Sequence, residues 1–256
     1  MQINATSFDP SNTSKFYRYE YEETYKIVTP AWSDMNLVLV PPPVPGPLST
    51  YNVTLIPRPN PDSKICYGTK SSDDIILTDT NDKEEDRVDH TVRFISNQDY
   101  IISYRYSILV KQYVQNLAAY TYYKTLKELS GSGGNIFSQN QPGFFYGNIK
   151  SSVNPDEKVI GFFEVSSVSS KRIFFNYSDL FPGENLPPYK VDCTGTAMNF
   201  CFNPNNPDCK GSSIVSALML DSLLYWMGST PVYVMVAPEC GDCTRFASNI
   251  IPPFWE

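Results

Sequence analysis

Residues 16–28, FYRYEYEETYKIV, alternate between two kinds of side chain along the whole stretch. Tyrosine and isoleucine dominate one set of alternate positions, charged residues and threonine the other, and Glu23 is the exception on the apolar side. A period of two residues is typical of a β-strand with one buried and one solvated face. The stretch therefore predicts a long strand. Glu22 and Glu23 would point to opposite faces, so they cannot act together as a carboxylate pair.

The composition supports a folded, β-rich protein. Hydrophobic residues make up 41% of the 256 residues, and aromatics make up 14%, including 18 tyrosines. Charged residues are 18%, below the roughly 25% usual for soluble proteins. Because tyrosine suits half-buried strands, this balance favours β structure.

The charge pattern excludes some partners. The net charge of −7 is acidic, and no cluster of lysine and arginine alternates with aromatics, so we expect no nucleic-acid binding. No run of about 18 apolar residues predicts a membrane-spanning helix. The first residues, MQINATSFDP, have no apolar core of a signal peptide.

Further segments carry strand or helix signals. Residues 116–130 predict the clearest helix, with Asn116 as its N-cap and Ala119, Tyr122, Tyr123, Leu126 and Leu129 at helical spacing. A second, short helix is expected over 212–227. Strands are expected over 74–78, 90–95, 99–114, 144–151, 158–178 and 231–238.

Two segments look irregular. Eight prolines fall between positions 41 and 61, and proline cannot donate to a sheet ladder, so residues 30–64 predict an extended, Pro-rich surface insertion. Residues 79–89, DTNDKEEDRVD, resemble a calcium loop only loosely, because Lys83 replaces an oxygen ligand. A solvated turn is the better interpretation of this charge run.

No catalytic signature is present. His90 is the single histidine, and a histidine on a strand is more often a packing residue than a general base. The GSGG run at 131–134 ends a helix instead of opening one, so it does not predict a phosphate site. We therefore expect no catalytic residue and no cofactor.

Six cysteines are spread through the chain, and Cys240 and Cys243 form its single Cys-x-x-Cys motif in ECGDC. A zinc site would need four ligands and a redox site a following helix, so both remain less favoured alternatives to structural disulfides. No metal site is predicted, and the pairing is not readable from the sequence. An even number of cysteines favours an exported, oxidised protein. The disulfide candidates are Cys66, Cys193, Cys201, Cys209, Cys240 and Cys243.

Several stretches together resemble the domain of unknown function 4249 family, which comprises surface lipoproteins of Bacteroidota. They are FYRYEYEETYKI (16–27), RYSILVKQYV to SGSGGNIF (105–137), GNIKSSVNPDEKVIGFFEVSSVSSKRIFF (147–175) and ECGDCTRFASNIIPPFW (239–255). The resemblance is to the C-terminal two-thirds of the family's domain. It implies an upstream segment with a lipidated cysteine that this chain lacks. It also implies a place on the outer-membrane surface beside a TonB-dependent transporter.

For the fold we expect a mainly β protein. An antiparallel sandwich like those of immunoglobulin or fibronectin domains would occupy residues 1–115. A second, mixed β region with one or two helices and disulfide staples would occupy residues 116–256. Phe254 and Trp255 would dock as an apolar plug beside the last cysteines.

The expected function is that of a non-enzymatic surface lipoprotein. It would be a binding or accessory component that works with a TonB-dependent nutrient transporter and takes a small ligand, a glycan or a peptide. It would meet the membrane only through the absent lipid anchor. A cell-surface enzyme, either a thiol redox protein or a glycan hydrolase, is the alternative, and an adhesin is the second alternative.

Overall fold

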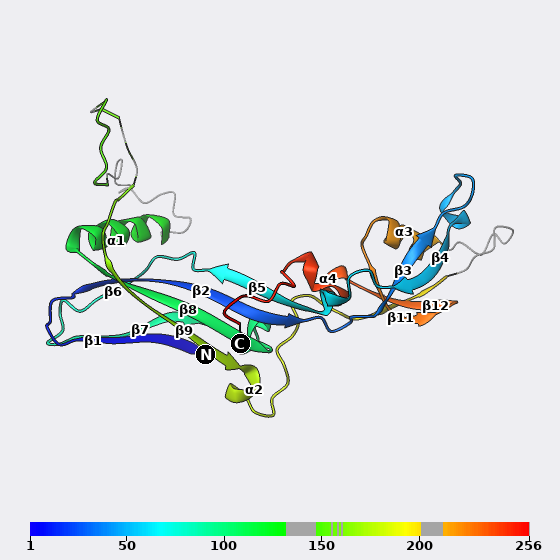
Figure 1. Ribbon diagram of the computed structural model, residues 1–256, viewed down its shortest axis with the longest axis horizontal. Helices are drawn as coiled ribbons and strands as arrows, with labels where there is room; N and C mark the ends of the chain where they lie inside the picture. Colours follow the sequence, from blue (N-terminus) through cyan, green and yellow to red (C-terminus); the bar gives the residue numbers. More distant parts are fainter. Residues whose placement is uncertain (132–146, 155, 158, 160, 201–211, 256) are drawn as a thin grey trace. The chain divides into compact units, whose positions relative to one another are not determined.

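The computed structural model describes residues 1–131, 147–154, 156, 157, 159, 161–200 and 212–255. It confirms the predicted mainly β fold with antiparallel sheets, and four α-helices accompany the strands in the described residues (Figure 1). Among these residues, no helix is both long enough and apolar enough to cross a membrane.

The strands are β1 (Gln2–Asp9), β2 (Phe16–Val28), β3 (Met35–Val40), β4 (Asn52–Pro57), β5 (Ile65–Ser71), β6 (Ile76–Asp79), β7 (Asp86–Phe94), β8 (Arg105–Gln115), β9 (Ser167–Asn176), β10 (Thr196–Asn199), β11 (Leu224–Ser229) and β12 (Val232–Val236). The helices are α1 (Leu117–Gly131), α2 (Tyr177–Leu180), α3 (Ser212–Met219) and α4 (Pro238–Gly241). Short 3₁₀ turns are η1 (Leu48–Thr50), η2 (Pro61–Lys64), η3 (Tyr100–Ile102) and η4 (Cys243–Arg245).

The chain divides into two compact units, each built from three segments. Unit 1 contains Met1–Glu23, Lys70–Ser96 and Ser107–Phe174, and unit 2 contains Thr24–Thr69, Asn97–Tyr106 and Phe175–Glu256. The largest sheet has the order β5-β2-β8-β9, and β6 also pairs with β2. The units therefore interleave along the chain, whereas consecutive regions 1–115 and 116–256 were expected from the sequence.

Strand β2 has the predicted bounds, and its tyrosine face is buried in unit 1. The antiparallel β1–β7 sheet covers this face, with valines of β7 in the core (Figure 1). Glu23, the exception in the alternation, is 1% exposed. Its carboxylate accepts hydrogen bonds from Arg93 of β7, from Nε at 3.0 Å and from Nη2 at 3.2 Å. The two hydrogen bonds from the Arg93 guanidinium thus compensate the burial of the Glu23 carboxylate.

The Pro-rich segment folds differently from the expected extended loop. Strands β3 and β4 form an antiparallel hairpin in unit 2, with register from Met35↔Pro57 to Val40↔Asn52. Five of the eight prolines, at positions 41–47, lie at the hairpin tip beyond the paired residues, so they cost the ladder no donor. Residues 35–40 and 52–57, on either side of the tip prolines, form the ladder.

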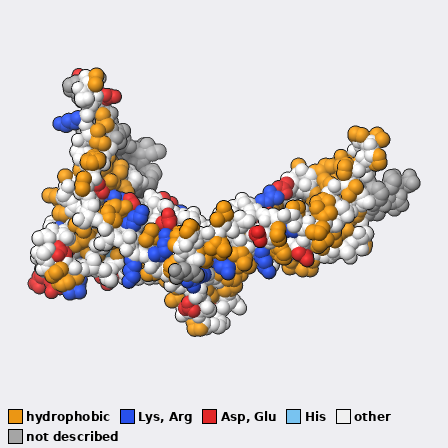
Figure 2. All heavy atoms as spheres, viewed as in Figure 1, with side chains coloured by type: hydrophobic (Ala, Val, Ile, Leu, Met, Phe, Trp, Pro, Cys, Tyr) orange, Lys and Arg blue, Asp and Glu red, His pale blue; other side chains and the backbone are white. Residues whose placement is uncertain are grey.

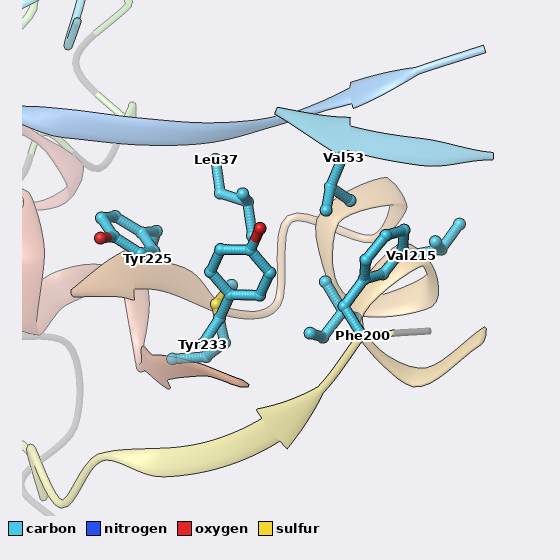
Figure 3. Close-up of a cluster of buried hydrophobic side chains, with 8 residues drawn as sticks. Leu37, Val53, Phe200, Val215, Tyr225 and Tyr233 are labelled. Carbon is cyan, nitrogen blue, oxygen red and sulfur yellow. The ribbon is translucent and has the colours of Figure 1, made fainter. Parts of the chain in front are cut away.

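The hairpin closes over an apolar core, drawn in Figure 3. Tyr225 of β11 and Tyr233 of β12 lie in it below Leu37 of β3 and Val53 of β4. The helix predicted over 212–227 is correct only in its first half, because α3 ends at Met219 and Asp221 adopts a positive φ of 50°. The following apolar residues instead pair with β12.

Three further expectations are corrected. Residues 147–151 and 161–166 form no strand, so the strands expected over 144–151 and 158–178 reduce to β9; residues 144–146 lie outside the described part. The charge run 79–89 is not a solvated turn throughout. Asp86 opens β7 and is buried, where it accepts hydrogen bonds from Tyr17 Oη at 2.7 Å and Thr80 Oγ1 at 2.6 Å. Strand β1 was not expected at all.

Candidate ligand-binding groove

The two cysteines of ECGDC bond to separate, distant partners. Cys240 is joined to Cys193 and Cys243 to Cys66, with Cα–Cα distances of 5.5 and 5.8 Å. Neither cysteine of the motif retains a thiol. The motif therefore contributes to two structural disulfides and is not a Cys-x-x-Cys redox centre. Cys201 and Cys209 lie outside the described residues. Within the described residues, no His, Cys, Asp or Glu side chains gather into a group that could hold a metal.

The Cys66–Cys243 bond holds the C-terminal segment beside β5. The next residue, Tyr67, donates its backbone N–H to the Ser248 carbonyl at 2.7 Å, and Ser248 donates back at 3.3 Å. The ring of Trp255 then meets the Tyr67 ring edge-on, with centroids 5.1 Å apart. Trp255 thus docks, as expected, and its partner is the ring of Tyr67.

Trp255 helps to line a groove of about 640 Å³ within unit 2. This volume lies in the range usual for sites that bind small organic molecules. Five aromatic side chains, two cations and several hydroxyl, amide and carboxylate groups surround it. The lining residues are Lys26, Tyr67, Ser103, Tyr104, Arg105, Asn176, Tyr177, Ser178, Phe181, Gly183, Glu184, Leu186 and Trp255.

Helix α2 forms one wall of this groove through local capping. Asn176 and Asp179 make a reciprocal capping box, which fixes the single turn at its start. Tyr177 donates its N–H to the Tyr104 carbonyl at 2.9 Å and its hydroxyl to the Asn185 carbonyl at 3.0 Å. The Phe181 ring lies 4.9 Å from the Tyr177 ring. Backbone carbonyls therefore fix Tyr177 of this aromatic wall at its N–H and at its hydroxyl.

The charges of the groove are mixed. Lys26 and Arg105 supply positive charge from β2 and β8, and Glu184 supplies an exposed carboxylate after α2. Burial raises the pKa of Tyr104 above its usual value. Its hydroxyl, like that of any tyrosine at neutral pH, is protonated and able to donate a hydrogen bond. Aromatic faces beside a few polar groups suit binding and orientation of a ligand.

A second, smaller cavity of about 220 Å³ lies in unit 1. The guanidinium of Arg18 stands between the rings of Tyr113 and Tyr123, at 4.2 and 4.7 Å from their centroids. It binds Glu20 and, at 3.0 Å, Glu164. The face of β2 that was expected to be solvated is therefore covered here, since aromatic rings stack on its arginine.

The carboxylates of this cluster are fixed by their partners. Burial works to raise the pKa of Glu20, but hydrogen bonds from Tyr113 and Arg18 outweigh it and leave that pKa below its usual value. Gln115 also donates to Glu164 at 2.7 Å. A general acid needs a raised pKa, so Glu20 suits a structural ion cluster better than the acid role in glycoside hydrolysis.

His90 packs within unit 1. Its ring stacks on Tyr19 with centroids 5.9 Å apart. Burial, together with the charges of Lys127 and Lys83, lowers its pKa. These contacts fit the expected packing role of a histidine on a strand.

Of the groove residues, sequence reasoning singled out Trp255 alone, as part of the expected plug. The other aromatic residues are distant from one another in the sequence, at positions such as 67, 104 and 177–181. No spacing rule connects them, because the β5–β2–β8 pairing and a disulfide bring them together. The even cysteine count was the one signal that pointed to this closure.

Comparison with known proteins gives one match. A family described as "Domain of unknown function (DUF4249)" matches residues 1–172. The closing motif at 239–255, one of the stretches that carry the resemblance, lies beyond the matched residues. No curated protein and no solved structure matches the chain.

Proposed function

The chain belongs to the family with the domain of unknown function DUF4249, and from this membership and the groove of unit 2 we propose that it is a ligand-binding protein. It would work as an accessory component of nutrient uptake at the outer-membrane surface of a Bacteroidota cell. The family resemblance supports this location and a TonB-dependent transporter as the partner.

The aromatic groove is the observation that carries the proposal. Tyr67, Tyr104, Tyr177, Phe181 and Trp255 present aromatic surface around a space large enough for two or three sugar rings or a short peptide. Lys26 and Arg105 add donors that would orient a polar group. Flat apolar faces beside hydrogen-bonding groups match both of these ligand classes.

Binding accounts for these sites better than catalysis does. The carboxylates around Arg18 are paired with one guanidinium, and Cys240 and Cys243 are consumed in disulfides. These arrangements favour neither a glycan hydrolase nor a thiol redox protein.

The groove is tested by titrating the protein against panels of oligosaccharides and short peptides, with tryptophan fluorescence and calorimetry as readouts. We expect saturable binding that falls at least tenfold in Trp255→Ala, because an aromatic wall is lost. Phe163→Ala removes an exposed aromatic of unit 1 and should leave the affinity unchanged. Equal loss in both variants, or no binding to either panel, would contradict the proposal.

The partner is tested separately, by mild detergent extraction and affinity purification from the native cell. A TonB-dependent β-barrel should co-purify in near-stoichiometric amount, and protease treatment of whole cells should reach the protein. Recovery from a cytoplasmic fraction alone would refute the surface role and leave the groove result standing.

A further inference from the structure

One part of unit 2 is nearly free of charge. The hairpin lobe, defined here as residues 35–57, 196–200 and 212–236, contains β3, β4, α3 and β10–β12 around the core of Figure 3. In these ranges Asp221 is the single charged residue, although charged residues make up 18% of the whole chain. Asp221 pairs with Arg245. Figure 2 shows the visible face of this lobe mostly orange and white.

The tip of the hairpin presents aliphatic side chains to the outside. Val40, Val44 and Leu48 are exposed, and Val44 is 75% exposed. The prolines at 41–47 lie between them and add further apolar surface. A soluble protein would usually place charged residues at the tip of a projecting hairpin.

The backbone of the tip is also short of hydrogen-bond donors. Between Val40 and Leu48, five of the residues are prolines and carry no N–H group. Thr50 donates to the Pro47 carbonyl from its N–H at 2.9 Å and from Oγ1 at 2.7 Å. The N–H of Tyr51 donates to the Leu48 carbonyl at 3.2 Å. Few N–H groups would therefore lose a water partner at the head-group boundary, where the carbonyl oxygens still meet water.

We propose that the hairpin tip, residues 40–48, inserts into a lipid surface at the boundary between head groups and acyl chains. Exposed aliphatic residues, absent charges and few free N–H groups are the properties that a segment needs at this depth. The paired strands β3 and β4 end where the tip begins, at Val40↔Asn52. This contact is additional to any lipid anchor and is independent of the ligand of the groove.

A lipid surface fits the lobe better than a protein partner does. Protein interfaces usually surround an apolar centre with arginine and a polar, partly charged rim. The described residues of the lobe include no lysine, arginine or glutamate, and Asp221, already paired with Arg245, is their single charge. Because it carries no basic residue, its binding should not depend on anionic lipids.

The test measures co-sedimentation of the 1–256 chain with phosphatidylcholine vesicles, with and without phosphatidylglycerol. We expect binding to both, little changed by salt. Val44→Asp should weaken binding about tenfold or more, because a charge would enter the apolar layer. Val153→Asp is the matched control, since Val153 is 92% exposed in unit 1 and should tolerate the same change without effect.

A second variant reports insertion directly. In Val44→Trp the indole emission should shift to the blue when vesicles are added, whereas Val153→Trp should show no shift. Absence of vesicle binding, or binding that Val44→Asp leaves intact, would overturn the proposal. So would a Val44-dependent contact found only with a detergent-solubilised β-barrel, which would assign the tip to a protein.

Discussion

At the scale of single residues, acidic side chains of unit 1 are paired with guanidinium groups. Glu23 breaks the apolar face of β2 and meets Arg93, and Arg18 on the other face meets Glu20 and Glu164. The position of Glu23 was visible in the sequence as an exception to the alternation. Its partner was not, because Arg93 is 70 positions away on a strand of the other sheet.

The Glu23–Arg93 pair gives the first prediction. Arg93→Met should lower the free energy of unfolding by about 3–5 kcal/mol, because it leaves a buried carboxylate without its guanidinium. The double variant Glu23→Leu/Arg93→Met should recover most of this loss, since it removes the charge as well. Urea unfolding measures both. A single variant that is as stable as the double one would show that Glu23 does not depend on Arg93.

Glu20 gives a prediction for pH. Its pKa is lower in the folded protein than in the unfolded chain, so its contribution is complete above the unfolded value of about 4.3. It is lost as the pH falls through the folded pKa. Glu20→Gln should therefore lose less stability than the wild type between pH 5 and pH 3. Glu128→Gln, exposed on α1, is the control and should follow the wild type, and identical acid profiles for all three proteins would contradict the assignment.

At the scale of elements, the sequence predicted those strands and helices whose bounds depend on local side-chain patterns. The alternation of 16–28 predicted β2 with its bounds, and Asn116 predicted the start of α1, where its Oδ1 accepts the Ala119 N–H at 2.9 Å. The β3–β4 hairpin was missed because its tip prolines dominated the composition. The apolar run of β11 fits a helix or a strand equally well, and pairing with β12 decides it.

The two disulfides are expected to contribute differently to the stability of the protein. Replacing Cys66 and Cys243 by alanine should cost about 5 kcal/mol of stability through loop-closure entropy, since they are 177 positions apart. Replacing Cys193 and Cys240, 47 positions apart, should cost about 4 kcal/mol.

Ligand affinity separates these two variants. Removal of Cys66–Cys243 frees the segment that carries Trp255, so groove binding should weaken and proteolysis after Cys243 should become faster. The Cys193–Cys240 variant serves as the control with a retained Trp255 wall. Unchanged binding in both variants would show that the staple does not shape the groove.

At the scale of the whole molecule, the two units contain cavities of different character. Unit 1 contains the charged cavity at Arg18, and unit 2 contains the aromatic groove and the uncharged hairpin lobe. The family match ends at residue 172, so Trp255 and the walls from α2 lie outside it. Properties of the matched region alone therefore do not account for the groove.

Hydrogen exchange in the presence of a ligand from the oligosaccharide or peptide panels tests the central claim most directly, because it locates the binding site by residue. Ligand should slow exchange at 103–105, 176–186 and 65–69, the segments that line the groove. Residues 18–22 and 71–75, which line the Arg18 cavity, should exchange as in the free protein. Protection confined to the Arg18 cavity, with none in the groove, would contradict the account.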